Sequence, residues 1–138
     1  MTPHSGEFKR LFGVVPSDSN IERIKLVEEN ALKHGITVIL KGSTDIVSDG
    51  KITYLCEKNT PAMTVGGTGD VLSGLVAGLL STNRNSLESA AAASYICGLA
   101  GKEVQEKLGF HMTSMDLIDS LPSVMKPFDR IVWLKWMY

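Results

Sequence analysis

The chain has 138 residues, of which 43% are hydrophobic and 21% charged, and its formal net charge is -1. This length suits one domain with a buried core. The near-neutral charge argues against a nucleic acid or a membrane surface as a partner held by bulk charge. The first ten residues lack the apolar stretch of a secretory signal. We therefore expect a globular protein of the cytoplasm.

The two cysteines, Cys56 and Cys97, are too few and too far apart for a disulfide framework or a zinc site. Both lie in apolar surroundings. We expect them to be reduced, buried thiols.

The first clear element is a helix in "PSDSNIERIKLVEENALKHG" (residues 16–35). Ser19 and Glu22 have the spacing of a capping box, and Gly35 is a typical C-terminal stop. An apolar stripe at helical spacing indicates the buried face of this helix, and it comprises Ile21, Ile24, Val27 and Ala31.

A strand and a hairpin are predicted next. The β-branched run "ITVILKG" (residues 36–42) suits a strand covered on both faces, as in a parallel sheet. The segment "TDIVSDGKITYLC" (residues 44–56) indicates two short strands, with Asp49 and Gly50 forming a tight turn between them.

Helices fill most of the remaining sequence. We predict one from about Thr68 to Leu80 and an alanine-rich one from about Ser86 to Leu108. Thr113 and Asp116 fit the capping box of a last helix that ends before Pro122. The tail, "FDRIVWLKWMY", carries both tryptophans and matches no element. This order of elements indicates an α/β fold.

Three glycines lie together before the third predicted helix, at Gly66, Gly67 and Gly69. If this helix begins near Thr68, its free N–H groups point into the loop and form an anion site. Asp70 then lies in the first turn, where the helix dipole favours a carboxylate. A phosphate site beside a base is what phosphoryl transfer requires, although a plain turn with a capping aspartate has the same pattern.

Two familiar nucleotide motifs are excluded. Leu75 and Val76 follow the glycines where the Walker pattern requires Lys and Ser or Thr. The dinucleotide fingerprint requires its glycines at a first strand-to-helix turn, whereas here they follow a hairpin. Two glycines further along, Gly74 and Gly78, are assigned to close helix packing instead of a ligand.

Three ordered segments carry a family resemblance: "TPHSGEFKRL", "VILKGSTDIVSDG" and "NTPAMTVGGTGDVLSG". Together they resemble the ATP- or ADP-dependent NAD(P)H-hydrate dehydratases of the ribokinase-like superfamily, over residues 2–121. The resemblance implies a three-layer α/β fold. It also implies that a nucleotide phosphorylates the ring hydroxyl of hydrated NADH or NADPH, after which phosphate is eliminated. Mg²⁺ would be held through the nucleotide, so no residue is assigned to it directly.

The resemblance also implies site residues. His4 and Glu7 would contact the substrate, together with Asp70, which is the candidate base. Two segments would bind the nucleotide, and their residues are Lys41, Gly42, Ser43, Thr44, Asp45, Thr60, Gly66, Gly67, Thr68 and Gly69.

The chain departs from the family in one respect, because family members have a substantial segment before "TPHSGE". We therefore expect residues 1–123 to be the C-terminal half of the domain, a short central sheet flanked by helices, and residues 124–138 to be a tail to which we assign no role. A half-sheet would expose an edge and an apolar face. We expect a homo-oligomer, or pairing with the missing N-terminal half.

Two other functions fit the same residues. A ribokinase-like kinase for a small sugar or vitamin precursor would use the same loop and Asp70, but "TPHSGE" favours the dehydratase. A truncated nucleotide-binding remnant without activity would keep the loop and lack part of the substrate wall.

Overall fold

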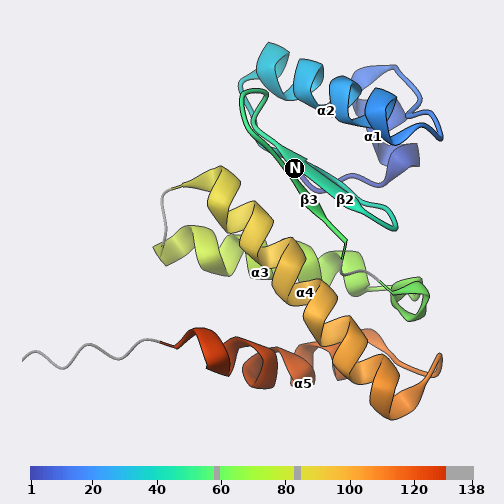
Figure 1. Cartoon of the computed structure of the whole chain (residues 1–138), viewed down its shortest axis with the longest axis vertical. Coiled ribbons are helices and arrows are strands. Elements are labelled where there is room, and N and C mark those ends of the chain that lie inside the picture. The colour runs from blue at the N-terminus through green and yellow to red at the C-terminus, as the bar shows by residue number, and fades with distance from the viewer. Residues whose placement is uncertain (58–59, 83–84, 130–138) are drawn as a thin grey trace, which may run out of the picture.

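The computed structural model describes residues 1–57, 60–82 and 85–129. Both tryptophans of the unassigned tail lie outside these residues. The described chain forms a small sheet with helices on both faces, in an α/β arrangement (Figure 1). Its elements are α1 (Ser5–Phe12), α2 (Asn20–His34), β1 (Val38–Leu40), β2 (Asp45–Ser48), β3 (Thr53–Cys56), α3 (Thr68–Thr82), α4 (Ser86–Leu108) and α5 (Ser114–Met125), with short 3-10 turns at Pro61–Met63 and Lys126–Phe128.

The sheet separates two hydrophobic clusters because its side chains alternate between faces. Val38 and Leu40 of β1 pack with α1 and α2, whereas Ile39 faces the cluster built by α3, α4 and α5. In β2, Ile46 packs with α1 and α2, and Val47 faces the other cluster. Figure 1 shows α1 and α2 on one side of the sheet, α3 and α4 on the other, and α5 beyond them.

Strand β1 is buried on both faces, as predicted, but its partner in the sheet is antiparallel. Val38 to Leu40 pair with Ser48 to Ile46, and β2 then pairs with β3. The cause is the short hairpin connection, which allows only antiparallel neighbours. Parallel contacts occur at the other edge of β1, where Ile39 and Lys41 donate backbone hydrogen bonds to the carbonyls of Met1 and Pro3, at 2.8 and 2.9 Å.

Helix α2 ends at Gly35, as predicted, but it begins without a capping box. The Ser19 side chain makes no capping hydrogen bond. In addition, the Ser19 N–H that Glu22 would have to accept donates instead to Ser17 Oγ, at 3.2 Å. Ile21 was also assigned wrongly to the core, because it lies in the first turn and is 69% exposed.

The hairpin forms one residue later than predicted. Asp49 N–H donates to the Ile52 carbonyl at 3.4 Å, so Gly50 and Lys51 are the turn residues. Asp49 stabilises the turn with its side chain, because Oδ1 accepts from the N–H groups of Lys51 and Ile52 at 2.8 and 2.9 Å. A carboxylate that bonds its own turn in this way belongs before the turn, not within it.

The predicted helices on the far side of the sheet are confirmed, with one correction at the end. The Thr113–Asp116 capping box is present, but α5 continues through Pro122 to Met125. Leu121 and Val124, on either side of the proline, pack against the cluster built by α3, α4 and α5. Burying them offsets the hydrogen bond that proline cannot donate.

Gly74 and Gly78 do not serve close packing among the described residues, since a Cβ added at either would meet no atom within 4 Å. They lie on an exposed face of α3 together with Ala77. On β3, Tyr54 and Leu55 are also exposed, at 44% and 49%. Within the described residues, no helix is long and apolar enough to cross a membrane.

Gly50 offers a test of this fold, because its φ is +87° and an added Cβ would lie 2.5 Å from the backbone nitrogen of Leu32 in α2. We expect Gly50→Ala to lower the free energy of unfolding by more than about 1 kcal/mol. Gly78→Ala is the matched control, and it should raise that free energy by up to about 1 kcal/mol in an open helical position. Urea unfolding followed by circular dichroism measures both, and equal effects would contradict the hairpin placement.

Candidate functional site

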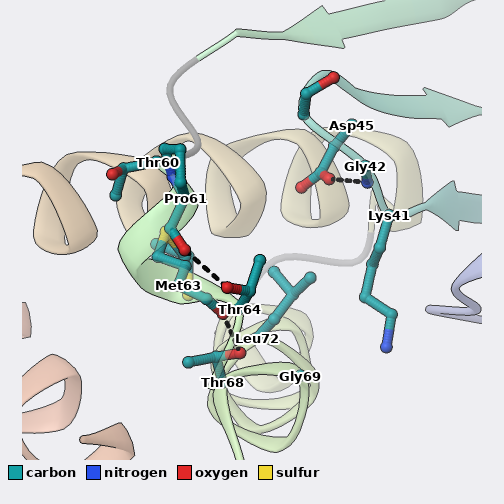
Figure 2. Close-up of a pocket in the computed structure, with 12 residues that line it drawn as sticks. Lys41, Gly42, Asp45, Thr60, Pro61, Met63, Thr64, Thr68, Gly69 and Leu72 are labelled. Atoms are coloured by element: carbon teal, nitrogen blue, oxygen red, sulfur yellow. Dashed lines mark hydrogen bonds between the residues drawn. The ribbon is translucent and has the colours of Figure 1, made fainter. Parts of the chain in front are cut away.

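A cavity of about 350 Å³ lies between the end of β1, the loop before α3 and the first turns of α3 (Figure 2). Its lining combines an ammonium group and several hydroxyls with apolar side chains. The lining residues are Lys41, Gly42, Ser43, Asp45, Thr60, Pro61, Met63, Thr64, Thr68, Gly69, Leu72 and Cys97. A mostly apolar pocket with a few convergent polar groups is typical of a small-molecule site.

The loop after β1 is held in shape by Asp45, which is only 4% exposed. Its Oδ1 accepts the Gly42 N–H at 3.0 Å, and its Oδ2 accepts the Ser94 hydroxyl at 2.7 Å (Figure 2 draws the first bond). Both bonds stabilise the carboxylate in a buried position. The first closes the loop over itself, and the second fastens it to α4.

The segment before α3 is fixed by three threonines. Thr60 Oγ1 accepts the Ala62 N–H at 3.3 Å and also donates to Gln105 of α4. Thr64 and Thr68 donate to the carbonyls of Pro61 and Met63, at 2.7 and 2.9 Å (Figure 2). These bonds hold the segment in the wall of the cavity.

Met63 anchors the same segment to α4. Its Sδ lies 2.3 Å from where a Cβ on Gly101 would stand, so only glycine leaves room for the methionine. Met63 is partly buried against the cluster built by α3, α4 and α5.

Helix α3 begins where the sequence predicted, directly after the glycines. Gly67 has a φ of +91°, a conformation that glycine adopts without strain, and its carbonyl accepts the N–H groups of Asp70 and Val71 at 3.0 and 3.1 Å. An added Cβ on Gly67 would lie 2.7 Å from Ser114 Oγ. The N–H groups of Thr68 and Gly69 precede these first helical bonds, at the positive end of the helix dipole.

The ammonium group of Lys41 reaches this helix end. A Cβ on Gly69 would lie 3.0 Å from Lys41 Nζ, so the absence of a side chain at residue 69 makes room for the charge. Lys41 Nζ also lies 3.5 Å from Glu7 Oε2. A cation and a helix N-terminus that converge on one cavity form an electrostatic site for an anion.

His4 and Glu7 lie outside this cavity and cap helix α1. The Nδ1 of His4 accepts the N–H groups of Gly6 and Glu7 at 3.0 and 3.2 Å, and Glu7 Oε2 accepts the His4 N–H at 2.7 Å. The hydrogen bond from His4 holds the pKa of Glu7 below its usual value, and the Lys41 charge acts in the same direction. "TPHSGE" is thus a helix start, and Glu7 connects it to Lys41.

Seven of the predicted site residues line the cavity, and six do not. The cavity is lined by these predicted residues: Lys41, Gly42, Ser43, Asp45, Thr60, Thr68 and Gly69. Thr44, Gly66, Gly67, His4, Glu7 and Asp70 are not among its lining residues. Asp70 is exposed in the first turn of α3.

Leu72 and Cys97 also line the cavity, although the sequence motifs do not include them among the site residues. Leu72 follows Thr68 and Gly69 at helical spacing, a signal that it shares their face of α3. Cys97 lies in α4, and both cysteines are buried and free, as predicted. Burial raises the pKa of Cys97 to about 11, so this thiol contributes apolar surface to the cavity.

The sequence matches the family described as NAD(P)H-hydrate dehydratase over residues 1–123. It is 74% identical over 132 residues to an ADP-dependent (S)-NAD(P)H-hydrate dehydratase of Nitrosopumilus maritimus, covering 96% of this chain and 46% of the relative. The chain thus spans about half the length of this curated relative.

Solved structures agree with this similarity. An ADP/ATP-dependent NAD(P)H-hydrate dehydratase from Bacillus subtilis, co-crystallized with ATP/Mg²⁺, superposes with a TM-score of 0.85 at 28% identity, over 93% of this chain and 47% of that one. A ribokinase-like superfamily protein from Enterococcus faecalis superposes with a TM-score of 0.78 at 26% identity, over 92% and 43% of the two chains. The ribokinase-like α/β fold is therefore confirmed.

The two neighbouring glycines of the loop provide a matched test. We expect Gly67→Ala to lower the free energy of unfolding by more than about 1 kcal/mol, because of its positive φ and the contact with Ser114. Gly66→Ala should leave that free energy within about 0.5 kcal/mol, since an added Cβ meets nothing within 4 Å. Thermal unfolding measures both variants. If Gly66→Ala were the more harmful change, the geometry of the loop would be wrong.

Proposed function

The chain belongs to the NAD(P)H-hydrate dehydratase family, and from this membership we propose that it acts in the nucleotide-dependent repair of hydrated NADH and NADPH. The observation that carries the proposal is the Lys41 ammonium group beside Gly69, at the start of α3 and in the wall of the cavity. This arrangement supplies what a transferable phosphate needs, namely a positive charge and backbone N–H groups at a helix N-terminus.

The first step is phosphoryl transfer to the substrate. The hydroxyl oxygen of the hydrated ring forms a bond to the terminal phosphorus of the nucleotide. The bond from that phosphorus to the bridging oxygen breaks, and the nucleotide leaves one phosphate shorter. Asp70, in the first turn of α3, takes the hydroxyl proton. In the second step the carbon–oxygen bond to phosphate breaks and inorganic phosphate leaves, the neighbouring ring carbon gives up a proton to solvent, and the electron pair of that C–H bond forms the dihydronicotinamide double bond.

In this proposal the residues of the cavity bind and orient. Lys41 and the N–H groups of Thr68 and Gly69 hold the transferred phosphate, and the apolar surfaces of Met63 and Leu72 cover the less polar part of the nucleotide. His4 caps α1 and Glu7 lies in its first turn, 3.5 Å from Lys41, and we place the hydrated ring beside them.

Magnesium fits this site only as part of the nucleotide complex. Among the described residues, no group of three or more His, Cys, Asp or Glu is placed to hold a metal ion. Mg²⁺ is commonly bound through substrate phosphates together with one or two carboxylates. When bound there, the ion would neutralise charge that develops on the phosphate oxygens.

The identity of the nucleotide donor and the cellular compartment are also proposed. The ADP-dependent name of the relative at 74% identity supports ADP as the donor, with ATP as the alternative. The free, buried cysteines support a reducing compartment, the cytoplasm.

We also propose that the chain works together with a segment equivalent to the remaining half of the family domain. The exposed faces of α3 and β3 support this, because apolar residues such as Leu55 and Leu80 are open to solvent there. A second copy of the chain is the alternative partner.

The second candidate function is nucleotide binding without turnover. The observation that favours it is that this chain forms a cavity lined by Lys41 and the start of α3, while it spans 46% of its relative. Binding of nucleotide with no return of the dihydronicotinamide would identify this function.

The test follows the absorbance of reduced nicotinamide with hydrated NADH, Mg²⁺ and ADP or ATP. It is run on the chain alone and with the N-terminal half of the Nitrosopumilus maritimus relative added. We expect a nucleotide-dependent rise in at least one of the two mixtures. Asp70→Asn should lower its rate by at least about a hundredfold, because the base is lost.

The matched control is Asp119→Asn, which removes a carboxylate from α5 far along the sequence and should leave the rate unchanged. A rate that Asp70→Asn leaves unchanged would contradict the assignment of the base. A stable phosphorylated product without dihydronicotinamide would instead identify a small-molecule kinase.

A further inference from the structure

Arg23 of α2 carries a half-buried charge that the proposed function does not use. Its Nε and Nη2 atoms are buried, and neither has a hydrogen-bond partner among the residues that the structure describes. Arginine N–H groups that lose water without gaining a partner destabilise a protein, so such an arrangement calls for an explanation.

The guanidinium group lies against the loop that follows β1. A Cβ on Gly42 would stand 2.8 Å from Arg23 Nη2 and 3.5 Å from Nη1. The guanidinium therefore occupies the space that any other side chain at residue 42 would need. Because Gly42 also lines the cavity, the Arg23 charge lies directly behind the cavity wall.

A negative charge belongs to the same loop. Asp45 lines the cavity, and its two oxygens accept hydrogen bonds from Gly42 and Ser94. A buried carboxylate in this position repels the phosphates of a nucleotide, and the repulsion is strong where solvent screening is weak. The Arg23 guanidinium lies beside Gly42 of the same loop, and its positive charge opposes that repulsion.

We propose that Arg23 is a specificity-determining residue, which compensates the charge of Asp45 and so lets the cavity prefer phosphorylated nucleotides to uncharged nucleosides. The inference rests on the proposed nucleotide site and adds to it a residue outside the cavity. A guanidinium that served only to support the loop would help every ligand equally, whereas a compensating charge helps a ligand in proportion to its negative charge.

The test is a series of ligands that differ in charge. Calorimetry on the full chain measures the dissociation constants of adenosine, AMP, ADP and ATP, the last two with Mg²⁺. We expect Arg23→Met to raise the dissociation constants of ADP and ATP by about tenfold and that of adenosine by less than about twofold. Arg23→Lys, which keeps the charge, should restore most of the affinity for ADP.

Two further variants isolate the mechanism. Lys25→Met removes one positive charge from an exposed position of the same helix and should change no dissociation constant by more than about twofold. In an Asp45→Asn background, Arg23→Met should have a smaller effect on ADP than in the unchanged chain, because the charge that it compensates is gone. If Arg23→Met does not fold at the assay temperature, Arg23→Gln is used in its place.

The outcomes separate the two proposals. If Arg23→Met weakened the binding of adenosine and of ADP equally, or no more than Lys25→Met does, the proposed role of Arg23 would be overturned. The proposed nucleotide site would remain intact. An unchanged chain that binds none of the four ligands would overturn the proposed site and this inference together.

Discussion

Burial of β1 on both faces is the constraint from which the rest of the molecule is arranged. Val38 and Leu40 pack against α1 and α2, and Ile39 packs toward α3 and α4, so one strand of three residues aligns both hydrophobic clusters. Its two edges are occupied as well, by β2 on one side and by the carbonyls of Met1 and Pro3 on the other. A strand held on four sides cannot slip in register without moving every neighbour.

The cavity follows from where that strand ends. Lys41 is the next residue, and its ammonium group connects segments that are distant in sequence, because it lies beside Gly69 of α3 and 3.5 Å from Glu7 of α1. The Asp45 carboxylate closes the loop after Lys41 by accepting the N–H of Gly42. Gly42 has no side chain, which leaves room for the Arg23 guanidinium beside it. Positive charge, a helix N-terminus and an apolar wall thus meet at one end of a rigid strand, which suits the recognition of a phosphorylated ligand.

The sequence predicted the positions of the helices and strands well, but it predicted less well how these elements pair and pack with one another. Helices α3 and α4 begin where local signals placed them, because glycines and caps act within one turn. The antiparallel pairing of β1, the passage of α5 through Pro122 and the exposure of Ile21 all depend on distant neighbours that local patterns do not contain. The same holds for the site. The motifs predicted Lys41 and Gly69, and the helical spacing of Leu72 from Gly69 is a local signal as well. Cys97 and Arg23, by contrast, enter only through packing between elements.

Binding of the nucleotide in the cavity is the central claim on which the proposed function rests. Amide chemical shifts of the ¹⁵N-labelled chain, recorded during a titration with ADP and Mg²⁺, test this without requiring turnover. We expect the largest shifts at Gly42, Ser43, Thr68 and Gly69, which line the cavity, and small ones at Lys107 and Asp119, which line a separate pocket between α4 and α5. Saturable shifts centred on that second pocket, or none in either place, would contradict the central claim.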